Sequence, residues 1–166
     1  MRRVEGEIVI HRPVDDVFDF VANERNEPRY NPQMRRVEQI SSGPIGCGTQ
    51  FHCEMGRNVE MVWEITAYER PRRLGGAGRA VVRLIRALPT MDMQGTLTFD
   101  AVPGGTRMRW SWQLEPCGVF WLLTPLIGWM GRRQEATIWA GLKQLLERQE
   151  TAVPSLMDGR TPVQSS

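Results

Sequence analysis

The sequence contains little of the chemistry that metal centres and disulfide frameworks require. Its 166 residues include two histidines and three cysteines, Cys47, Cys53 and Cys117. No two cysteines are spaced as CxxC, and no HxxxH or HExxH pattern occurs, so neither a disulfide framework nor a zinc site is predicted. GxGxxG and phosphate-loop patterns are absent as well. We therefore expect no metal and no cofactor.

A strong net charge and a membrane-spanning run are also lacking. The formal net charge is +2, so nucleic acid is not predicted as a partner. The most apolar run, GVFWLLTPLIGWMGRR at 118–133, holds about 14 apolar or small residues, whereas a spanning helix needs about 20. Glu5 and Glu7 interrupt the N-terminus, so no signal peptide is predicted and a cytoplasmic location is expected.

What the sequence does contain is a series of segments in which apolar and polar residues alternate. This alternation is typical of half-buried β-strands. Short turn signals such as PGG at 103–105 separate the segments, which favours an antiparallel meander. The segments are 4–10, 34–41, 49–55, 59–69, 74–84, 90–100 and 106–115.

Two further regions have the spacing of amphipathic helices. Val14, Val17, Phe18 and Val21 predict a short helix after Pro13, and RNEPRYNP adds at most one more turn. Apolar residues at steps of three and four then predict a long helix from about 119 to 150. Its Trp139 is expected either to pack on a sheet edge or to serve a homodimer interface.

These elements predict a single α+β domain over residues 1–151. One strand, one or two short helices, about six further strands and a long helix suit a curved antiparallel sheet wrapped around that helix, with an internal cavity between them. The last residues, 152–166, are rich in Pro, Ser, Thr and Gly. They are expected to form a disordered C-terminal tail.

Four segments occur in an order and spacing that point to a known fold. They are RPVDDVFDFVANERNEPRYNP (12–32), ISSGPIGCGTQF (40–51), VEMVWEITAYERPRRL (59–74) and TLTFDAVPGGTRMRW (96–110). With the long helix, this pattern resembles the SRPBCC (START-like, helix-grip) superfamily, and within it the bacterial polyketide cyclase/dehydrase-like branch. The resemblance covers 4–150 and implies a helix-grip fold with a hydrophobic cavity. It implies no single activity, because binding and several chemistries share this scaffold.

The residues predicted to face the cavity are large and apolar, with a few polar groups among them. Tryptophan and methionine suit a hydrophobic, ring-containing ligand, since indoles offer broad surfaces and thioethers adapt to irregular shapes. The predicted ligand-binding residues are Tyr30, Phe51, Met55, Met61, Trp63, Met93, Leu97, Phe99, Met108, Trp110, Trp112, Ile127, Met130, Gln134 and Ile138.

No catalytic constellation stands out in the sequence. Tyr30, Trp63 and Arg79 are the candidates for a donor or an acid. The alternation of residues places Arg79 on the polar face of its strand, so it reaches the cavity only if the register of the 75–93 hairpin differs from this pattern. The carboxylates considered, Glu60, Glu64 and the aspartates of the first helix, are expected to be solvated.

Three functions remain open on these grounds. The first is a carrier or sensor of a small hydrophobic molecule. The second is a polyketide aromatase/cyclase or dehydratase that uses the same cavity. The third is a lipid or quinone transfer protein that contacts membranes transiently through Trp121 and Trp129, next to Arg132 and Arg133.

Overall fold

The structure is a computed structural model that describes residues 2–83, 90–116 and 124–151. Side chains are described within 3–83, 90–115 and 133–148. The tail predicted at 152–166 lies outside the described residues, as do residues 118–123 of the apolar run at 118–133.

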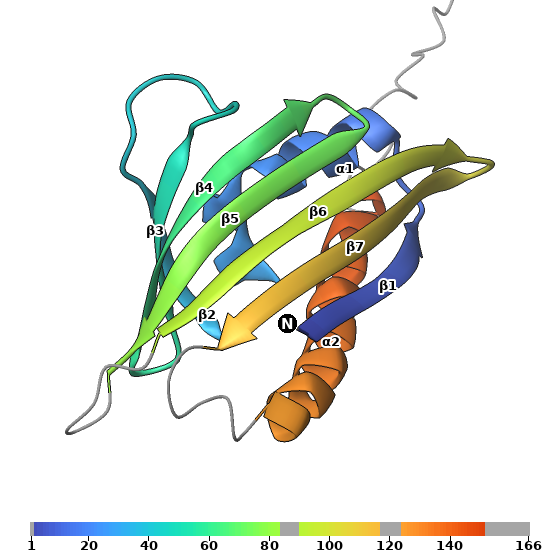
Figure 1. Cartoon of the computed structure of the whole chain (residues 1–166). Helices are drawn as coiled ribbons and strands as arrows, with labels where there is room; N and C mark the ends of the chain where they lie inside the picture. Colours follow the sequence, from blue (N-terminus) through green and yellow to red (C-terminus); the bar gives the residue numbers. More distant parts are fainter. Residues whose placement is uncertain (1, 84–89, 117–123, 152–166) are drawn as a thin grey trace, which may run out of the picture.

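Seven strands form one antiparallel sheet in the order β1-β7-β6-β5-β4-β3-β2 (Figure 1). The sheet confirms the predicted α+β class and the number of strands. It also fixes the register of the 75–93 hairpin, in which Gly78 pairs with Met93. The strands are β1 (Arg2–Ile10), β2 (Met34–Gln39), β3 (Gln50–Met55), β4 (Val59–Glu69), β5 (Arg73–Val82), β6 (Thr90–Val102) and β7 (Gly105–Pro116).

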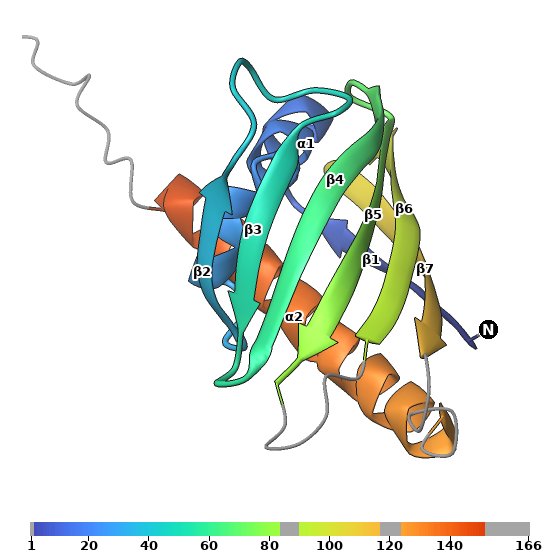
Figure 2. The same cartoon turned by 60° about the vertical axis from the view of Figure 1, so that its left-hand side comes forward.

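Three helical segments lie on the concave side of this sheet. They are α1 (Val14–Ala22), the six-residue 3₁₀ helix η1 (Glu24–Arg29) and the long helix α2 (Thr124–Thr151). Figure 2 shows the strands curving around α2, which runs diagonally behind them. The apolar run at 118–133 therefore continues into the helix that the sheet grips. Among the described helices, none is both long and apolar enough to cross a bilayer.

A bulge in β4 changes one predicted strand face. Strict alternation would place Ala67 beside Ile65 and Trp63 on the concave face. Instead, the register shifts between Ile65 and Ala67. Tyr68 consequently pairs with Leu74 on the concave side and packs edge-on against Phe18 of α1, with ring centroids 5.2 Å apart.

The inner face of α2 packs closely on the segment that links η1 to β2. Ile138, Trp139, Leu142 and Leu146 are buried along this face. Trp139 therefore lies in the core and not on an exposed interface. At Gly141 the helix approaches so near that an added Cβ would lie 2.6 Å from the backbone oxygen of Tyr30.

A polar cluster fastens the C-terminal half of α2 to the end of β1. The side chain of Lys143, the only lysine in the chain, donates to the backbone oxygen of Val9 at 2.6 Å. Glu147 accepts from the backbone N–H of His11 at 2.9 Å and pairs with Lys143 at 2.9 Å. Burial acts to raise the pKa of Glu147, but these interactions outweigh it and lower the pKa to about 2.

We expect Gly141→Ala to destabilise the protein although alanine favours helix. The helix propensity gain is about 1 kcal/mol, but the new methyl group meets a backbone oxygen that cannot rotate away, and such overpacking costs about 1–3 kcal/mol. Urea denaturation should therefore give a lower free energy of unfolding. Gln144→Ala, on the exposed face of the same helix, is the control and should change little. A Gly141→Ala protein as stable as the control would show that the close approach is not a constraint.

Candidate functional site

Two tryptophans on the concave face lie flat against the sheet because the neighbouring strand carries glycine beneath each. A Cβ added to Gly76 of β5 would lie 2.2 Å from Cζ2 of Trp63, and one added to Gly95 of β6 would lie 1.9 Å from Cε3 of Trp112. Only glycine leaves this space free, because every other residue has a Cβ. The two rings meet edge to face, with centroids 5.9 Å apart.

A second group of rings continues this surface toward β1 and α2. Trp110 lies across Gly6, where an added Cβ would be 2.3 Å from its Cζ2. Its ring centroid is 5.6 Å from that of Trp139 on α2, and Trp139 stacks on Tyr30 at 6.2 Å. We call Tyr30, Trp63, Trp110, Trp112 and Trp139 together the aromatic lining.

Glu135 of α2 is held by two members of the aromatic lining. The indole N–H groups of Trp112 and Trp139 both donate to its Oε2, at 3.0 and 2.8 Å. Burial raises the pKa of Glu135, although both hydrogen bonds act to lower it. These hydrogen bonds give each indole N–H an acceptor, as buried Trp139 and half-buried Trp112 require.

A pair of carboxyl groups on η1 faces the same interior. Side chains three residues apart eclipse in a 3₁₀ helix, so Glu24 and Glu27 project from one side of the turn. Their carboxyl groups hydrogen-bond to each other, and Trp63 donates to Glu24. Asn31 donates from Nδ2 to Oε1 of Glu27 at 2.8 Å.

Burial and mutual repulsion disfavour two charges on this pair. Burial, followed by the charge of Glu27 and the hydrogen bond to it, raises the pKa of Glu24 well above its usual value. Burial also raises the pKa of Glu27, against the lowering effect of the hydrogen bonds from Asn31 and Glu24. A single proton shared across the pair would relieve this repulsion, and the larger rise in pKa makes Glu24 the member that holds it to the higher pH.

Tyr30 lies within the electrostatic reach of all three carboxyl groups. Burial raises its pKa well above the usual value of a phenol, and the charges of Glu27, Glu24 and Glu135 raise it further. Burial likewise raises the pKa of Cys53 on β3, with smaller contributions from Glu24 and Glu27. Both groups stay protonated at neutral pH, so Tyr30 can donate a hydrogen bond but cannot serve as a base.

The predicted ligand-binding residues whose side chains are described belong to the core or pack against it, with the exception of Gln134. Trp112, Met55, Met93 and Gln134 keep some exposure, and Gln134 donates to Oε1 of Gln33 at 2.6 Å. The side chains of Ile127, Met130 and Trp129, and the whole of Trp121, lie outside the described residues. The buried members are Tyr30, Phe51, Met61, Trp63, Leu97, Phe99, Met108, Trp110 and Ile138.

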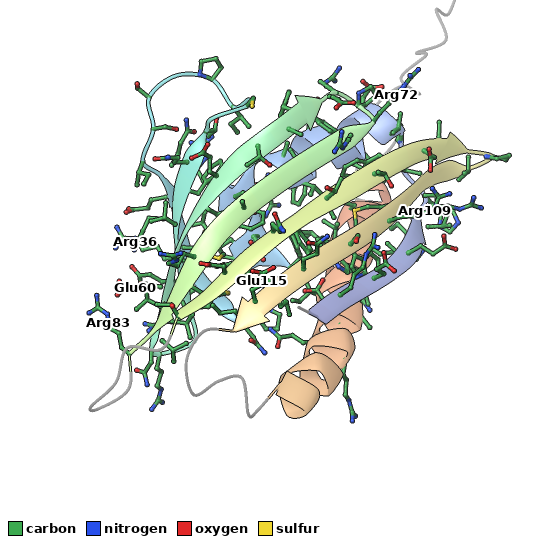
Figure 3. All side chains as sticks on the ribbon, viewed as in Figure 1. Arg36, Glu60, Arg72, Arg83, Arg109 and Glu115 are labelled. Carbon is green, nitrogen blue, oxygen red and sulfur yellow. The ribbon has the colours of Figure 1, made fainter. Side chains whose placement is uncertain are left out.

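Arg79 does not join this group, which corrects its place among the catalytic candidates. It lies on the convex face of β5 and pairs with Asp92 of β6 through Nε at 2.6 Å. Arg83 pairs with Glu60 at 2.8 Å, also away from α2. Figure 3 shows Glu60 and Arg83 close together at the left-hand edge of the sheet, away from α2.

The sequence reasoning missed the three glutamates of the interior. Glu24 and Glu27 stand in ERNEP, a segment broken by Pro28 that resembles a solvated turn. A usable signal was the three-residue spacing inside a stretch too short for an α-helix. For Glu135, the signal was its position three and four residues before Ile138 and Trp139, which extends the buried stripe of α2.

These carboxyl groups do not make a metal centre. Within the described part of the chain, no three His, Cys, Asp or Glu side chains come together in a group that could hold a metal ion. The arrangement instead offers hydrogen-bond acceptors, one shared proton and a broad aromatic surface, which are the means to bind and orient an organic molecule.

Comparison with known proteins agrees with this architecture. The model of the family described as "Polyketide cyclase / dehydrase and lipid transport" matches residues 1–147. No curated protein sequence matches the chain. A conserved protein from Geobacillus kaustophilus has a similar structure, with a TM-score of 0.75 at 10% identity over 89% of this chain and 97% of that one.

Two other similar structures come from biosynthetic systems. DynU16, from the dynemicin biosynthetic locus, has a TM-score of 0.64 at 15% identity. The di-domain ARO/CYC protein BexL, from the BE-7585A biosynthetic pathway, has a TM-score of 0.60 at 20% identity. Each match covers 89% of this chain but 48% of DynU16 and 47% of BexL, so the chain spans about half of either protein. At these identities the likeness shows the fold alone.

We expect Glu24→Gln to stabilise the protein at pH 8. The pKa of Glu24 is raised in the folded state, so the folded protein loses stability as pH rises from about 4.3, the usual value for an unfolded chain, through that raised pKa. An uncharged amide removes this loss and should raise the free energy of unfolding by about 1 kcal/mol at pH 8. Urea denaturation at pH 5 and pH 8 measures it, and the gain should shrink at pH 5.

The matched control for this measurement is Glu69→Gln. Glu69 is exposed at the end of β4, where it pairs with Arg73, so the change should have little effect at either pH. If Glu24→Gln lowered stability equally at both pH values, that result would contradict the raised pKa of this half-buried carboxyl group.

Proposed function

Because this chain belongs to the polyketide cyclase/dehydrase and lipid transport family, we propose that it binds a hydrophobic, ring-containing molecule between the concave face of the sheet and α2. In this role the protein is a carrier or sensor. The observation that carries the proposal is the aromatic lining, in which glycines hold the indole rings flat. Each indole lies against its own neighbouring strand, and the open face of an indole is a surface on which another ring can stack.

The glycines support binding over a purely structural role. Glycine inside a strand costs about 0.5–1 kcal/mol relative to alanine, and Gly76 and Gly95 sit in the middle of β5 and β6. If these positions only filled the core, alanine at Gly76 and Gly95 with smaller side chains in place of the two indoles would give a more stable protein. Holding large indoles flat at this cost is instead what a ring-binding surface requires.

The shared proton on Glu24 and Glu27 favours a second candidate, a cyclase or dehydratase. In an aldol cyclisation, the Glu27 carboxylate would take a proton from carbon next to a carbonyl, and that carbon would form a bond to a second carbonyl carbon. Glu24 would donate its proton to the second carbonyl oxygen. No oxidant is needed, and the proton on Glu27 returns to Glu24 across their hydrogen bond. Loss of water from the alcohol then gives the ring double bond.

We expect the neutral fluorescent probe N-phenyl-1-naphthylamine to bind the protein and Gly95→Ala to weaken that binding about fivefold or more. The added methyl group pushes Trp112 off the sheet and into the space for the ligand. Fluorescence titration measures the affinity, with far-UV circular dichroism to confirm that the variant is folded. Gly46→Ala is the control, because nothing lies within 4 Å of its Cβ position.

Two results would contradict the binding proposal. One is that the wild-type protein does not bind the probe or other neutral aromatic compounds. The other is that folded Gly95→Ala binds the probe as tightly as Gly46→Ala does, which would place the bound molecule away from the aromatic lining.

The cyclase candidate predicts that Glu27→Gln abolishes turnover but keeps binding. Loss of a general base lowers the rate by about 100-fold or more, whereas the amide keeps the volume of the side chain. Mass spectrometry after incubation with a linear poly-β-ketone thioester would detect the cyclised, dehydrated product. Wild-type protein that binds the thioester but gives no product above the uncatalysed rate would rule this candidate out.

A further inference from the structure

We infer that the molecule bound against the aromatic lining is a cation, specifically a hydrophobic ammonium compound. The inference rests on the proposed function, which gives the position of the ligand beside the tryptophans. What it adds is the charge of that ligand. Two independent features carry it: the indole rings, and the carboxyl groups of Glu24, Glu27 and Glu135.

The indole rings favour a positive charge through their π-electrons. The face of an aromatic ring is electron-rich, and tryptophan binds cations more strongly than tyrosine or phenylalanine does. Gly76 and Gly95 lay Trp63 and Trp112 flat on the sheet. One face of each indole is therefore turned away from the backbone of the neighbouring strand, toward the interior.

The carboxyl groups supply negative charge to the same interior without a matching cation. Their hydrogen-bond donors are neutral, namely three indole N–H groups and the amide of Asn31. Of the residues that the structure describes, no arginine or lysine contributes to the electrostatic surroundings of Glu24, Glu27 or Glu135. A neutral ligand would leave this repulsion in place, whereas a cation would relieve it.

This shortage of positive charge is confined to the interior. The chain has 21 basic residues, and on its surface they pair repeatedly with acids. Arg70 pairs with Asp19 at 2.7 Å and Arg79 with Asp92 at 2.6 Å. The chain thus places basic partners beside its exposed acids and uses uncharged donors for its interior ones.

Glu135 is the carboxyl group best placed to contact the cation. Both indole donors bind its Oε2, and no described residue donates to Oε1. The two hydrogen bonds fix the orientation of the carboxylate between β7 and α2. An ammonium group at Oε1 would lie beside the indoles that hold the carboxylate, so the ion pair and the ring contacts would act on the same group.

The test compares two probes that have the same shape but differ in charge. Benzyltrimethylammonium is a permanent cation, and neopentylbenzene is its neutral carbon analogue. We expect the cation to bind wild-type protein about tenfold more tightly at pH 8, measured by quenching of tryptophan fluorescence. Glu135→Gln should remove most of this preference and leave the affinity for neopentylbenzene within about twofold, whereas the surface control Glu69→Gln should keep the preference.

A second measurement needs no variant and so does not depend on folding of Glu135→Gln. The preference for the cation should grow from pH 5 to pH 8 as Glu24 and Glu27 of η1 and Glu135 of α2 ionise. Tyr30 and Cys53, the other titratable groups facing this interior, stay protonated in that range, and β4 and β7 present indoles. The quaternary probe keeps its charge throughout.

The outcomes separate this inference from the proposed function. Equal or tighter binding of neopentylbenzene at pH 8, or a preference that does not change with pH, would overturn the inference and leave hydrophobic binding intact. If neither of these probes nor N-phenyl-1-naphthylamine binds, the proposed function fails and the inference fails with it.

Discussion

The packing of indole rings directly onto strand backbone is the constraint on which the rest of this interior depends. Trp63 and Trp112 can lie flat only because Gly76 and Gly95 leave the space beneath them empty. In that position their N–H groups reach carboxyl groups on η1 and α2. The sheet therefore orients carboxyl groups that η1 and α2 contribute. Through the positions of Trp63 and Trp112, the two glycines determine where these carboxyl groups lie.

Local backbone geometry then explains why the acids stay together. The 3₁₀ turn of η1 aligns Glu24 with Glu27, and the segment that follows carries Tyr30 into contact with Trp139. Gly141 lets α2 approach the backbone of Tyr30, whose ring lies between Trp139 of α2 and Phe20 of α1. These half-buried acids, whose pKa values are raised, lower the stability of the folded state near neutral pH. A protein that keeps such a cost at its centre commonly does so for function.

Much of the fold could be predicted from the sequence because alternation of polarity reports directly which strand face is buried. The pattern of Met108, Trp110 and Trp112 was sufficient to place these side chains on the concave face. The bulge at Ile65 was not visible, since an extra residue in one strand leaves the local composition unchanged. The site was harder to predict, because ERNEP has the composition of a surface turn. Which of its side chains face the interior depends on packing against β2 and α1, and local composition does not report this packing.

Binding of a cation and acid–base catalysis require different protonation states of Glu24. A cation held against the aromatic lining would favour the ionised forms of all three carboxyl groups and would draw the shared proton off Glu24. Catalysis of cyclisation needs that proton, because it is the one delivered to the carbonyl oxygen. The same three glutamates therefore suit a neutral polyketone only while Glu24 stays protonated, and suit an ammonium ligand best once it is ionised. Under these two proposals, the charge of the bound molecule would determine whether the interior binds a cation or catalyses a cyclisation.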